Sequence, residues 1–186
     1  MKRVIDTGLA LLLLPIVALP AGLIALLVGL TSKGPVLYWS TRIGRNNVPF
    51  MMPKFRTMKV DTPALATHLL QNPRRYLTPI GGFLRKTSLD ELPQLWSILK
   101  GDMSFVGPRP ALHNQEDLIS LRTERCVHTL LPGLTGWAQI NGRDELSISR
   151  KVDLDADYMR RQSVLFDLRI LVLSCATIIK REGVSH

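Results

Sequence analysis

The longest apolar stretch of the chain covers residues 7–30, and as an α-helix it would be about 35 Å long, enough to cross a bilayer. Positive charges flank it on both sides, with Lys2 and Arg3 before it and Lys33 after it. Lysine and arginine beside a membrane segment favour the cytoplasmic side, and a simple spanning helix cannot place both flanks there. A helix that enters the membrane, bends and returns to the same face can.

Pro15 and Pro20 lie within the apolar stretch. Proline removes a backbone hydrogen bond and crowds the preceding turn, so each one kinks a helix. Together with the flanking charges, the prolines favour a re-entrant membrane helix-break-helix over residues 1–31, followed by one compact interfacial domain over residues 32–186. Prolines also occur in spanning helices, so a single span stays the alternative.

Beyond this segment, short apolar runs alternate with turn-forming residues, which predicts a mainly α fold with a small β-hairpin (α+β). The hairpin would pair residues 36–39 with residues 50–55, and Pro49 and Pro53 would confine the second strand to a sheet edge. Start and stop signals predict helices over residues 62–72, 78–86, 91–100, 111–128, 147–161 and 166–181.

Two segments have open interpretations. Residues 131–143 are rich in turn formers, and they form either a hairpin or a loop that presents backbone N–H groups and Arg143 to an anion. The last helix carries an apolar stripe formed by Leu168, Leu171, Val172, Cys175, Ile178 and Ile179. This stripe is either part of the core or lies in a membrane interface.

The composition narrows the choice of partner. The 186 residues carry a formal net charge of +9 and a hydrophobic fraction of 46%, which favours a phosphorylated substrate, nucleic acid or an acidic membrane surface. Aromatic residues make up only 6%, too few for a base-stacking surface, so nucleic acid is disfavoured. Cys126 and Cys175 lie far apart and the histidines are scattered, so the sequence does not predict a zinc site.

An adjacent pair of acids, Asp90 and Glu91, stands at the start of a short apolar helix. Ser88 and Glu91 have the spacing of a capping box, and Asp90 is itself a suitable cap, so the pair has a purely structural interpretation. Alternatively, neighbouring side chains on a helix point about 100° apart, so one carboxylate can attack a phosphate while the other holds a metal or moves a proton. A diphosphate substrate would require cations around such a site.

A stiff loop at residues 107–110 places Arg109 between Pro108 and Pro110. Both prolines fix the backbone, so the guanidinium loses little entropy on binding and suits bidentate contact with a phosphate or stacking on a planar base. The structural alternative is a rigid connector between two helices. Further basic side chains available to a phosphate are Lys54, Arg56, Arg85 and Arg143.

Long motifs in this chain match one known family. The segments that closely resemble the small monotopic phosphoglycosyl transferases, the bacterial sugar transferase family, are residues 89–95, 100–110 and 132–143, with shorter motifs at residues 2–6, 54–58 and 180–185. The resemblance covers essentially the whole chain in the same order. Several long motifs in register are far more specific than any single one.

The resemblance implies an enzyme that transfers a sugar 1-phosphate from a UDP-sugar to polyprenol (undecaprenyl) phosphate, with Mg²⁺ as cofactor, and so initiates glycoconjugate biosynthesis. By motif, Asp90 is implied as the nucleophile and as a metal ligand, forming a covalent phosphosugar intermediate as UMP leaves, with Glu91 as its partner. The residues implied in binding uridine or phosphate are Pro108, Arg109, Pro110, Arg85, Lys54, Arg56, Asn141, Gly142 and Arg143.

The resemblance also implies a monotopic protein in the inner leaflet of the bacterial inner (cytoplasmic) membrane, with its catalytic domain on the cytoplasmic face. Members of the family break their membrane helix at a Ser-Pro pair, whereas Leu19 precedes Pro20 here. A serine can hydrogen-bond the carbonyls that proline frees, and a leucine cannot. Either Pro15 shares the bend, or the break is built differently.

A second hypothesis is a non-catalytic, membrane-anchored basic adaptor that binds anionic lipid or nucleic acid. It accounts for the positive charge and the apolar segment but gives no role to Asp90, Glu91 or Arg109. We therefore favour the transferase and expect no nucleic acid partner. The sequence leaves open which UDP-sugar is used, which glycan pathway is served and whether the chain forms a homo-oligomer.

Overall fold

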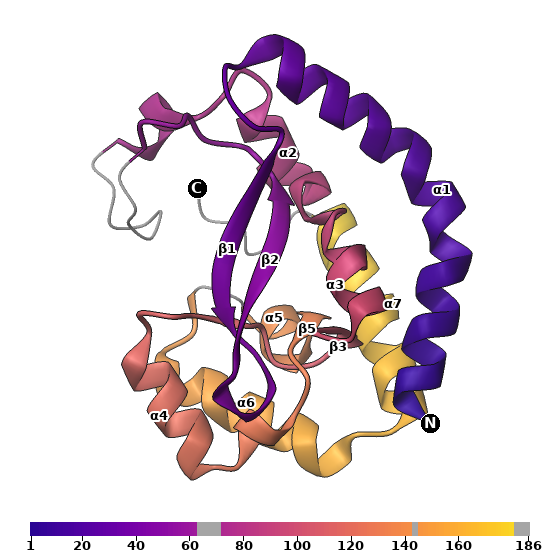
Figure 1. Cartoon of the computed structure of the whole chain (residues 1–186). Helices are drawn as coiled ribbons and strands as arrows, with labels where there is room; N and C mark the ends of the chain where they lie inside the picture. Colours follow the sequence, from indigo (N-terminus) through magenta and orange to yellow (C-terminus); the bar gives the residue numbers. More distant parts are fainter. Residues whose placement is uncertain (63–71, 143–144, 181–186) are drawn as a thin grey trace.

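The computed structural model describes residues 1–62, 72–142 and 145–180 (Figure 1). Within these ranges the chain is mainly helical with two small sheets, so the predicted α+β class is confirmed. The α-helices are α1 (Lys2–Thr31), α2 (Gly81–Thr87), α3 (Gln94–Lys100), α4 (Glu116–Glu124), α5 (Trp137–Ile140), α6 (Ile148–Arg161) and α7 (Val164–Lys180). The strands are β1 (Leu37–Ile43), β2 (Pro49–Phe55), β3 (Ser104–Val106), β4 (Ala111–Leu112) and β5 (Gly133–Thr135). Short 3₁₀ helices are η1 (Arg45–Asn47), η3 (Pro73–Tyr76), η4 (Leu89–Glu91) and η5 (Val127–Thr129).

α1 curves along one side of the molecule as a single continuous helix (Figure 1). Its first half buries Ala10 in the main core, and its second half buries Ile24 and Val28 in a second cluster. This differs from the predicted helix-break-helix, because the helix continues through Pro15 and Pro20. Each proline removes only its own backbone hydrogen bond, which bends a helix without having to end it. The re-entrant path through a membrane stays a prediction.

Both ends of α1 are tied to the domain by guanidinium groups. Near its start, Arg3 donates to Leu99 O (2.6 Å) at the end of α3. Beyond its end, the buried Arg56 donates to Ser32 O (2.8 Å) and Ser32 Oγ (2.9 Å). The last carbonyls of a helix have no partner within the helix, and guanidinium donors supply one. The two ends of α1 therefore attach to the same domain.

β1 and β2 form the predicted hairpin, in which Tyr38 pairs with Lys54 and Arg42 pairs with Phe50. The sheet order is β2-β1-β4, so β2 is the edge strand that its two prolines predict. The strands are longer than expected, and Arg42 lies in β1 rather than in the turn. α3 packs on both α1 and β2. The core residues at this contact and beyond it include Met52, Leu95, Ile98, Met103, Phe105 and Ile170.

β3 and β5 pair in parallel, so the hairpin alternative for residues 131–143 is wrong. In this pairing the two backbones approach each other closely. A Cβ atom on Gly107, Gly133 or Gly136 would overlap neighbouring backbone atoms, so only glycine fits at these positions. Across the pair, Gly107 N–H donates to Thr135 O (2.9 Å). These glycines therefore let two chain segments meet, and the anion-binding alternative for this segment stays a prediction.

The other helices follow the predictions to differing degrees. α6 is confirmed, and at its start Ser147 Oγ accepts a hydrogen bond from Arg150 N–H (3.3 Å). The predicted helix over residues 111–128 is divided, because its first two residues pair with β1 as β4 and only its middle forms α4. The predicted helix over residues 62–72 falls mainly outside the described residues.

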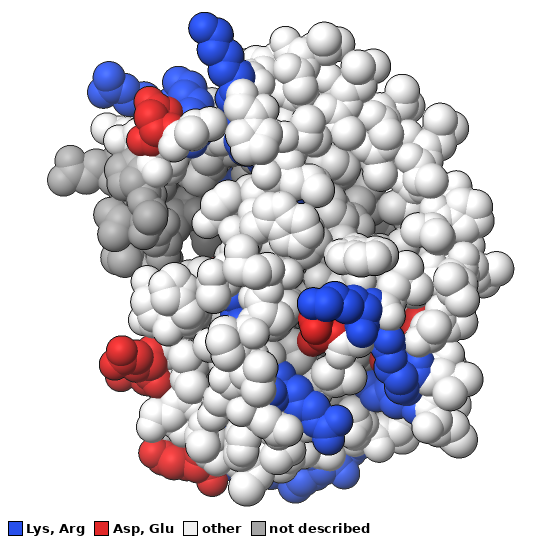
Figure 2. Space-filling model, in the orientation of Figure 1, with Lys and Arg blue, Asp and Glu red and all other residues white. Residues whose placement is uncertain are grey.

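α7 turns Phe166 and Ile170 into the core and leaves Leu168 and Val172 exposed. Among the described side chains of the predicted apolar stripe, Cys175 is exposed as well, and Leu171 packs against the core. Most of this described part lies outside the core, which favours its membrane-interface interpretation. α1 exposes many leucines as well, and Figure 2 shows an uncharged surface along it. By length and composition α1 could cross a membrane.

Candidate active site

Asp90 and Glu91 lie in η4, a 3₁₀ turn between α2 and α3. The left-handed backbone of Ser88 (φ 57°) ends α2, and α3 begins only at Gln94. In this described part of the chain, no side chain caps the start of η4 or of α3. The capping interpretation of the acidic pair is therefore wrong, and both carboxylates are available for other contacts.

The acidic pair adjoins the apolar helix. Leu89 and Leu92 lie on either side of it and pack against the cluster that contains Ile24 and Val28 of α1. Asp90 itself is only 7% exposed. The acidic pair therefore lies next to the second half of α1.

Lysine and arginine side chains from two other segments reach the acidic pair. Lys54 Nζ, from β2, lies 2.7 Å from Glu91 Oε1 and 4.0 Å from Asp90 Oδ2. Arg109 Nη2, from the loop after β3, lies 3.1 Å from the same Glu91 oxygen. Hydrogen bonds between charged groups are short and strong, so Glu91 joins β2, η4 and the arginine loop.

The two carboxylates differ in their electrostatics. Burial would raise the pKa of Glu91, but Lys54 and Arg109 together hold that pKa well below its usual range. Burial raises the pKa of Asp90, against the lowering effect of Lys54, and the charge of Glu91 adds to the rise. Glu91 is thus a fixed anion that orders two cations, whereas Asp90 is the more weakly paired acid.

Arg85 belongs to the same surroundings. It comes from α2, and its Nε donates to Thr57 Oγ1 (3.0 Å). Burial lowers the pKa of Arg85, and the charge of Asp90 opposes this shift. Arg85 therefore lies within the electrostatic reach of Asp90, as expected for a cation that would face a phosphate.

Arg42 is a member of the site that the sequence reasoning missed. Burial and then the nearby charge of Arg109 lower the pKa of Arg42 to about 10, while Glu91 opposes them. Its Nη1 donates to Pro110 O (3.3 Å) in the arginine loop. The pattern of the hairpin could have indicated Arg42. Lys54 pairs with Tyr38, and Arg42 follows Tyr38 by four residues. Because every second residue of a strand lies on the same face, Lys54 and Arg42 share one face once the strand is long enough to include Arg42. We call the following residues the acidic-pair site: Asp90, Glu91, Lys54, Arg42, Arg85 and Arg109.

Residues 1–181 match the family described as bacterial sugar transferase. This chain belongs to that family. The match covers the acidic-pair site, the arginine loop and α1 together, so the sequence resemblance is confirmed over nearly the whole chain.

Named relatives support the same assignment. The chain is 42% identical over 182 residues to the UDP-glucose:undecaprenyl-phosphate glucose-1-phosphate transferase of Escherichia coli, which covers 94% of this chain and 39% of that protein. It is 41% identical over 192 residues to the undecaprenyl-phosphate glucose phosphotransferase of Komagataeibacter xylinus (97% and 35%). It is 39% identical over 188 residues to the uncharacterized sugar transferase EpsL of Bacillus subtilis (100% and 91%). The chain thus spans about two fifths of the first relative and nearly all of the last.

The other residues implied by the family resemblance are placed less directly. Pro108 and Pro110 flank Arg109 and line a pocket on its loop. Arg56 is not brought to the acidic pair, because its guanidinium binds the backbone beyond the end of α1. Asn141 Nδ2 donates to Trp137 O (2.7 Å) at the end of α5, and Gly142 (φ 136°) follows it. Arg143 lies outside the described residues. Their roles in substrate binding stay predictions.

The described residues bear on the predicted Mg²⁺ only through the acidic pair. Among the described residues, no group of three or more histidine, cysteine, aspartate or glutamate side chains is gathered for a metal ion. Mg²⁺ is commonly bound through one or two carboxylates together with substrate phosphates. Asp90 as a ligand of Mg²⁺ therefore stays a prediction.

Proposed function

We propose that this chain transfers a sugar 1-phosphate from a UDP-sugar to polyprenol phosphate, with a covalent intermediate on Asp90. The observation that carries the proposal is the acidic-pair site: two carboxylates in one turn, with cations converging on them, beside an apolar helix. Membership of the bacterial sugar transferase family and the names of the relatives support the same reaction class.

The reaction would proceed in two displacements at one phosphorus atom. First, a carboxylate oxygen of Asp90 attacks the phosphorus that bears the sugar, and the bond to the bridging oxygen of UMP breaks, so UMP leaves with the electron pair. The product is a mixed anhydride between Asp90 and the sugar phosphate. Next, a phosphate oxygen of polyprenol phosphate attacks the same phosphorus, and the Asp90 carboxylate is released.

The cations of the site would make the first attack feasible. A carboxylate and a diphosphate repel each other, so positive charge must neutralise the substrate. Glu91 holds Lys54 and Arg109 in place for this task, and Arg85 lies within the electrostatic influence of Asp90. Asp90 and the diphosphate would hold Mg²⁺, which supplies further charge neutralisation when bound.

We also propose a monotopic arrangement on the cytoplasmic face of the bacterial inner membrane. The attachment of both ends of α1 to one domain supports it, because a spanning helix would separate its ends. A test replaces the exposed Cys126 and Cys175 with serine and introduces Val4→Cys or Lys33→Cys for labelling with an impermeant thiol reagent. Both positions should react from the same side of sealed vesicles, and reaction from opposite sides would exclude the arrangement.

The activity is tested by UMP release. The full chain, in detergent or nanodiscs with Mg²⁺ and undecaprenyl phosphate, is offered a panel of UDP-sugars, and at least one should release UMP and give a lipid-linked sugar. Asp90→Asn should abolish both, while Asp153→Asn, a carboxylate of the exposed pair with Arg125, should retain them. Lack of UMP release with every donor would reject the activity, and normal turnover in Asp90→Asn would reject the nucleophile.

A further inference from the structure

The three carbonyl oxygens of residues 108–110 are held by three different parts of the molecule. Pro108 O accepts from Gly133 N–H (2.9 Å), Arg109 O from Arg122 Nη1 (2.8 Å) and Pro110 O from Arg42 Nη1 (3.3 Å). Proline has no N–H to donate, so the backbone of this loop depends mainly on what binds its carbonyls. Gly133 belongs to β5 and Arg42 to the acidic-pair site, whereas Arg122 belongs to neither.

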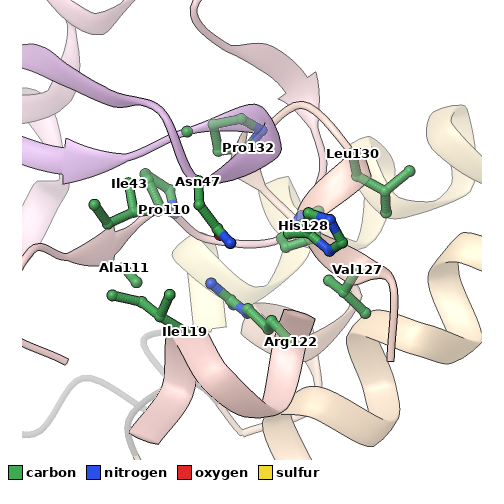
Figure 3. A pocket seen from close by; sticks show the side chains of 12 residues that line it. Ile43, Asn47, Pro110, Ala111, Ile119, Arg122, Val127, His128, Leu130 and Pro132 are labelled. Atoms are coloured by element: carbon green, nitrogen blue, oxygen red, sulfur yellow. The ribbon is translucent and has the colours of Figure 1, made fainter. Parts of the chain in front are cut away.

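Arg122 is held in position by a buried carboxylate, that of Asp155. Arg122 lies on α4, and its Nε and Nη2 donate to Asp155 Oδ2 on α6 at 3.0 and 2.7 Å. Asp155 is 1% exposed. Figure 3 shows Arg122 in the pocket of this loop, among apolar residues that include Pro110, Ile119 and Val127. We call Arg122 and Asp155 the support pair.

We infer that Arg122 is a positioning residue, which acts through the backbone of Arg109 to aim the Arg109 guanidinium at Glu91 and the nucleotide. This inference rests on the proposed function. The chain of contacts runs from Asp155 to Arg122, to Arg109 O, and through the Arg109 side chain to Glu91 Oε1. If the loop shifted by a fraction of an ångström, the Arg109 guanidinium would shift with it. Small displacements of a group that positions substrate can lower the reaction rate severely.

The role requires arginine in particular. Arg122 uses one edge of its guanidinium for Asp155 and the remaining nitrogen for the loop carbonyl, at fixed angles. A lysine ammonium can neutralise Asp155 but does not reproduce this fork. Arg122→Lys therefore keeps the charge and removes the alignment. Arg125 offers a matched control, because it pairs with Asp153 of α6 from the end of α4 and makes its ion pair at the surface.

The first measurement is the rate of UMP release by the full chain. Arg122→Lys should lower kcat/KM for the UDP-sugar about tenfold, mainly by raising KM, while Arg125→Lys should leave it unchanged. In an Arg109→Ala background, Arg122→Lys should have no further effect, because it acts through Arg109. Equal fold losses in both backgrounds would show that Arg122 acts independently of Arg109 and would overturn the inference.

The second measurement is hydrogen exchange of the protein without substrate. Arg122→Lys should speed exchange in the peptide covering residues 104–112, and Arg125→Lys should not. Unchanged exchange in that peptide would overturn the inference. Because this readout needs no turnover, it still decides the role of Arg122 if the wild-type chain releases no UMP and the proposed function fails.

A second variant guards against misfolding. Should thermal unfolding show that Arg122→Lys is not folded, Asp155→Asn replaces it, since asparagine keeps one acceptor oxygen for Arg122. Its faster exchange should again be confined to residues 104–112, with a smaller loss of kcat/KM. A uniform increase of exchange along the chain would identify the support pair as a general stabiliser and overturn the inference.

Discussion

The acidic-pair site and the support pair are linked by one loop, yet they are built differently. In the support pair, a single oxygen of Asp155 receives two hydrogen bonds from the one guanidinium of Arg122. In the acidic-pair site, a single oxygen of Glu91 receives one hydrogen bond from Lys54 and another from Arg109. The first arrangement joins two helices, and the second joins three segments around the acidic pair.

The charge balance explains the difference. The support pair contains one cation and one anion, whereas the acidic-pair site contains more cations than carboxylates. Burial raises the pKa of Asp155 despite Arg122, but two cations keep the pKa of Glu91 low. Uncompensated positive charge in a partly buried site is costly unless an anion joins it. The charges of the support pair are therefore balanced, whereas the excess positive charge of the acidic-pair site supports the proposed phosphorylated substrate.

The largest expected effect is on stability, in the support pair. Arg122→Met removes the partner of a buried carboxylate and should lower the free energy of unfolding by about 3–5 kcal/mol. Arg125→Met removes a surface pair between the same parts of the fold and should change it by less than about 0.5 kcal/mol. Denaturant unfolding of both variants in detergent checks this prediction. Equal losses in the two variants would contradict the distinction between a buried and a surface pair.

The residues of the acidic-pair site were more predictable than those of the support pair. Asp90 and Glu91 are adjacent, and Lys54 and Arg109 lie beside prolines in recognisable motifs, so local sequence identified them. Arg42 escaped because the strand was predicted too short, and the face it shares with Lys54 appears only once the register is known. Arg42 was missed because the predicted strand ended too early, and a prediction of longer strands would have included it.

The support pair could not be predicted from the sequence. Its two members are separated by 33 positions and lie on different helices, so only the tertiary packing of α4 on α6 brings them together. Arg56 is an error of the opposite kind: its motif suggested a phosphate contact, but its guanidinium donates to the backbone of Ser32, just beyond the end of α1. Local pattern predicts which residues are charged and rigid, whereas the partner of each charge depends on contacts distant in sequence.

The next largest effect is expected on catalysis, in the acidic-pair site. Glu91→Gln removes the charge that orders Lys54 and Arg109 but keeps the size of the side chain. We expect kcat/KM for UMP release to fall about a hundredfold, since both cations lose their fixed position. Unfolding should be affected less than in Arg122→Met, because glutamine keeps an acceptor oxygen for Lys54 and Arg109. A Glu91→Gln variant with normal kcat/KM would show that the cations are ordered without Glu91.

The smallest expected effect is on the pH dependence of stability, through the ion pairs of Glu91. The folded-state pKa of Glu91 lies below its ordinary value of 4.5, so its ion pairs contribute stability above that pH and lose it as the pH falls further. The stability advantage of wild-type protein over Glu91→Gln should therefore be constant from about pH 6 to about 4.5 and should decrease, by on the order of 1 kcal/mol, as the pH falls from there to about 3. Unfolding midpoints of both proteins across this range measure the difference. Parallel curves would mean that Glu91 gains no net stabilisation from Lys54 and Arg109, and that these cations are held for the substrate at no benefit to the fold.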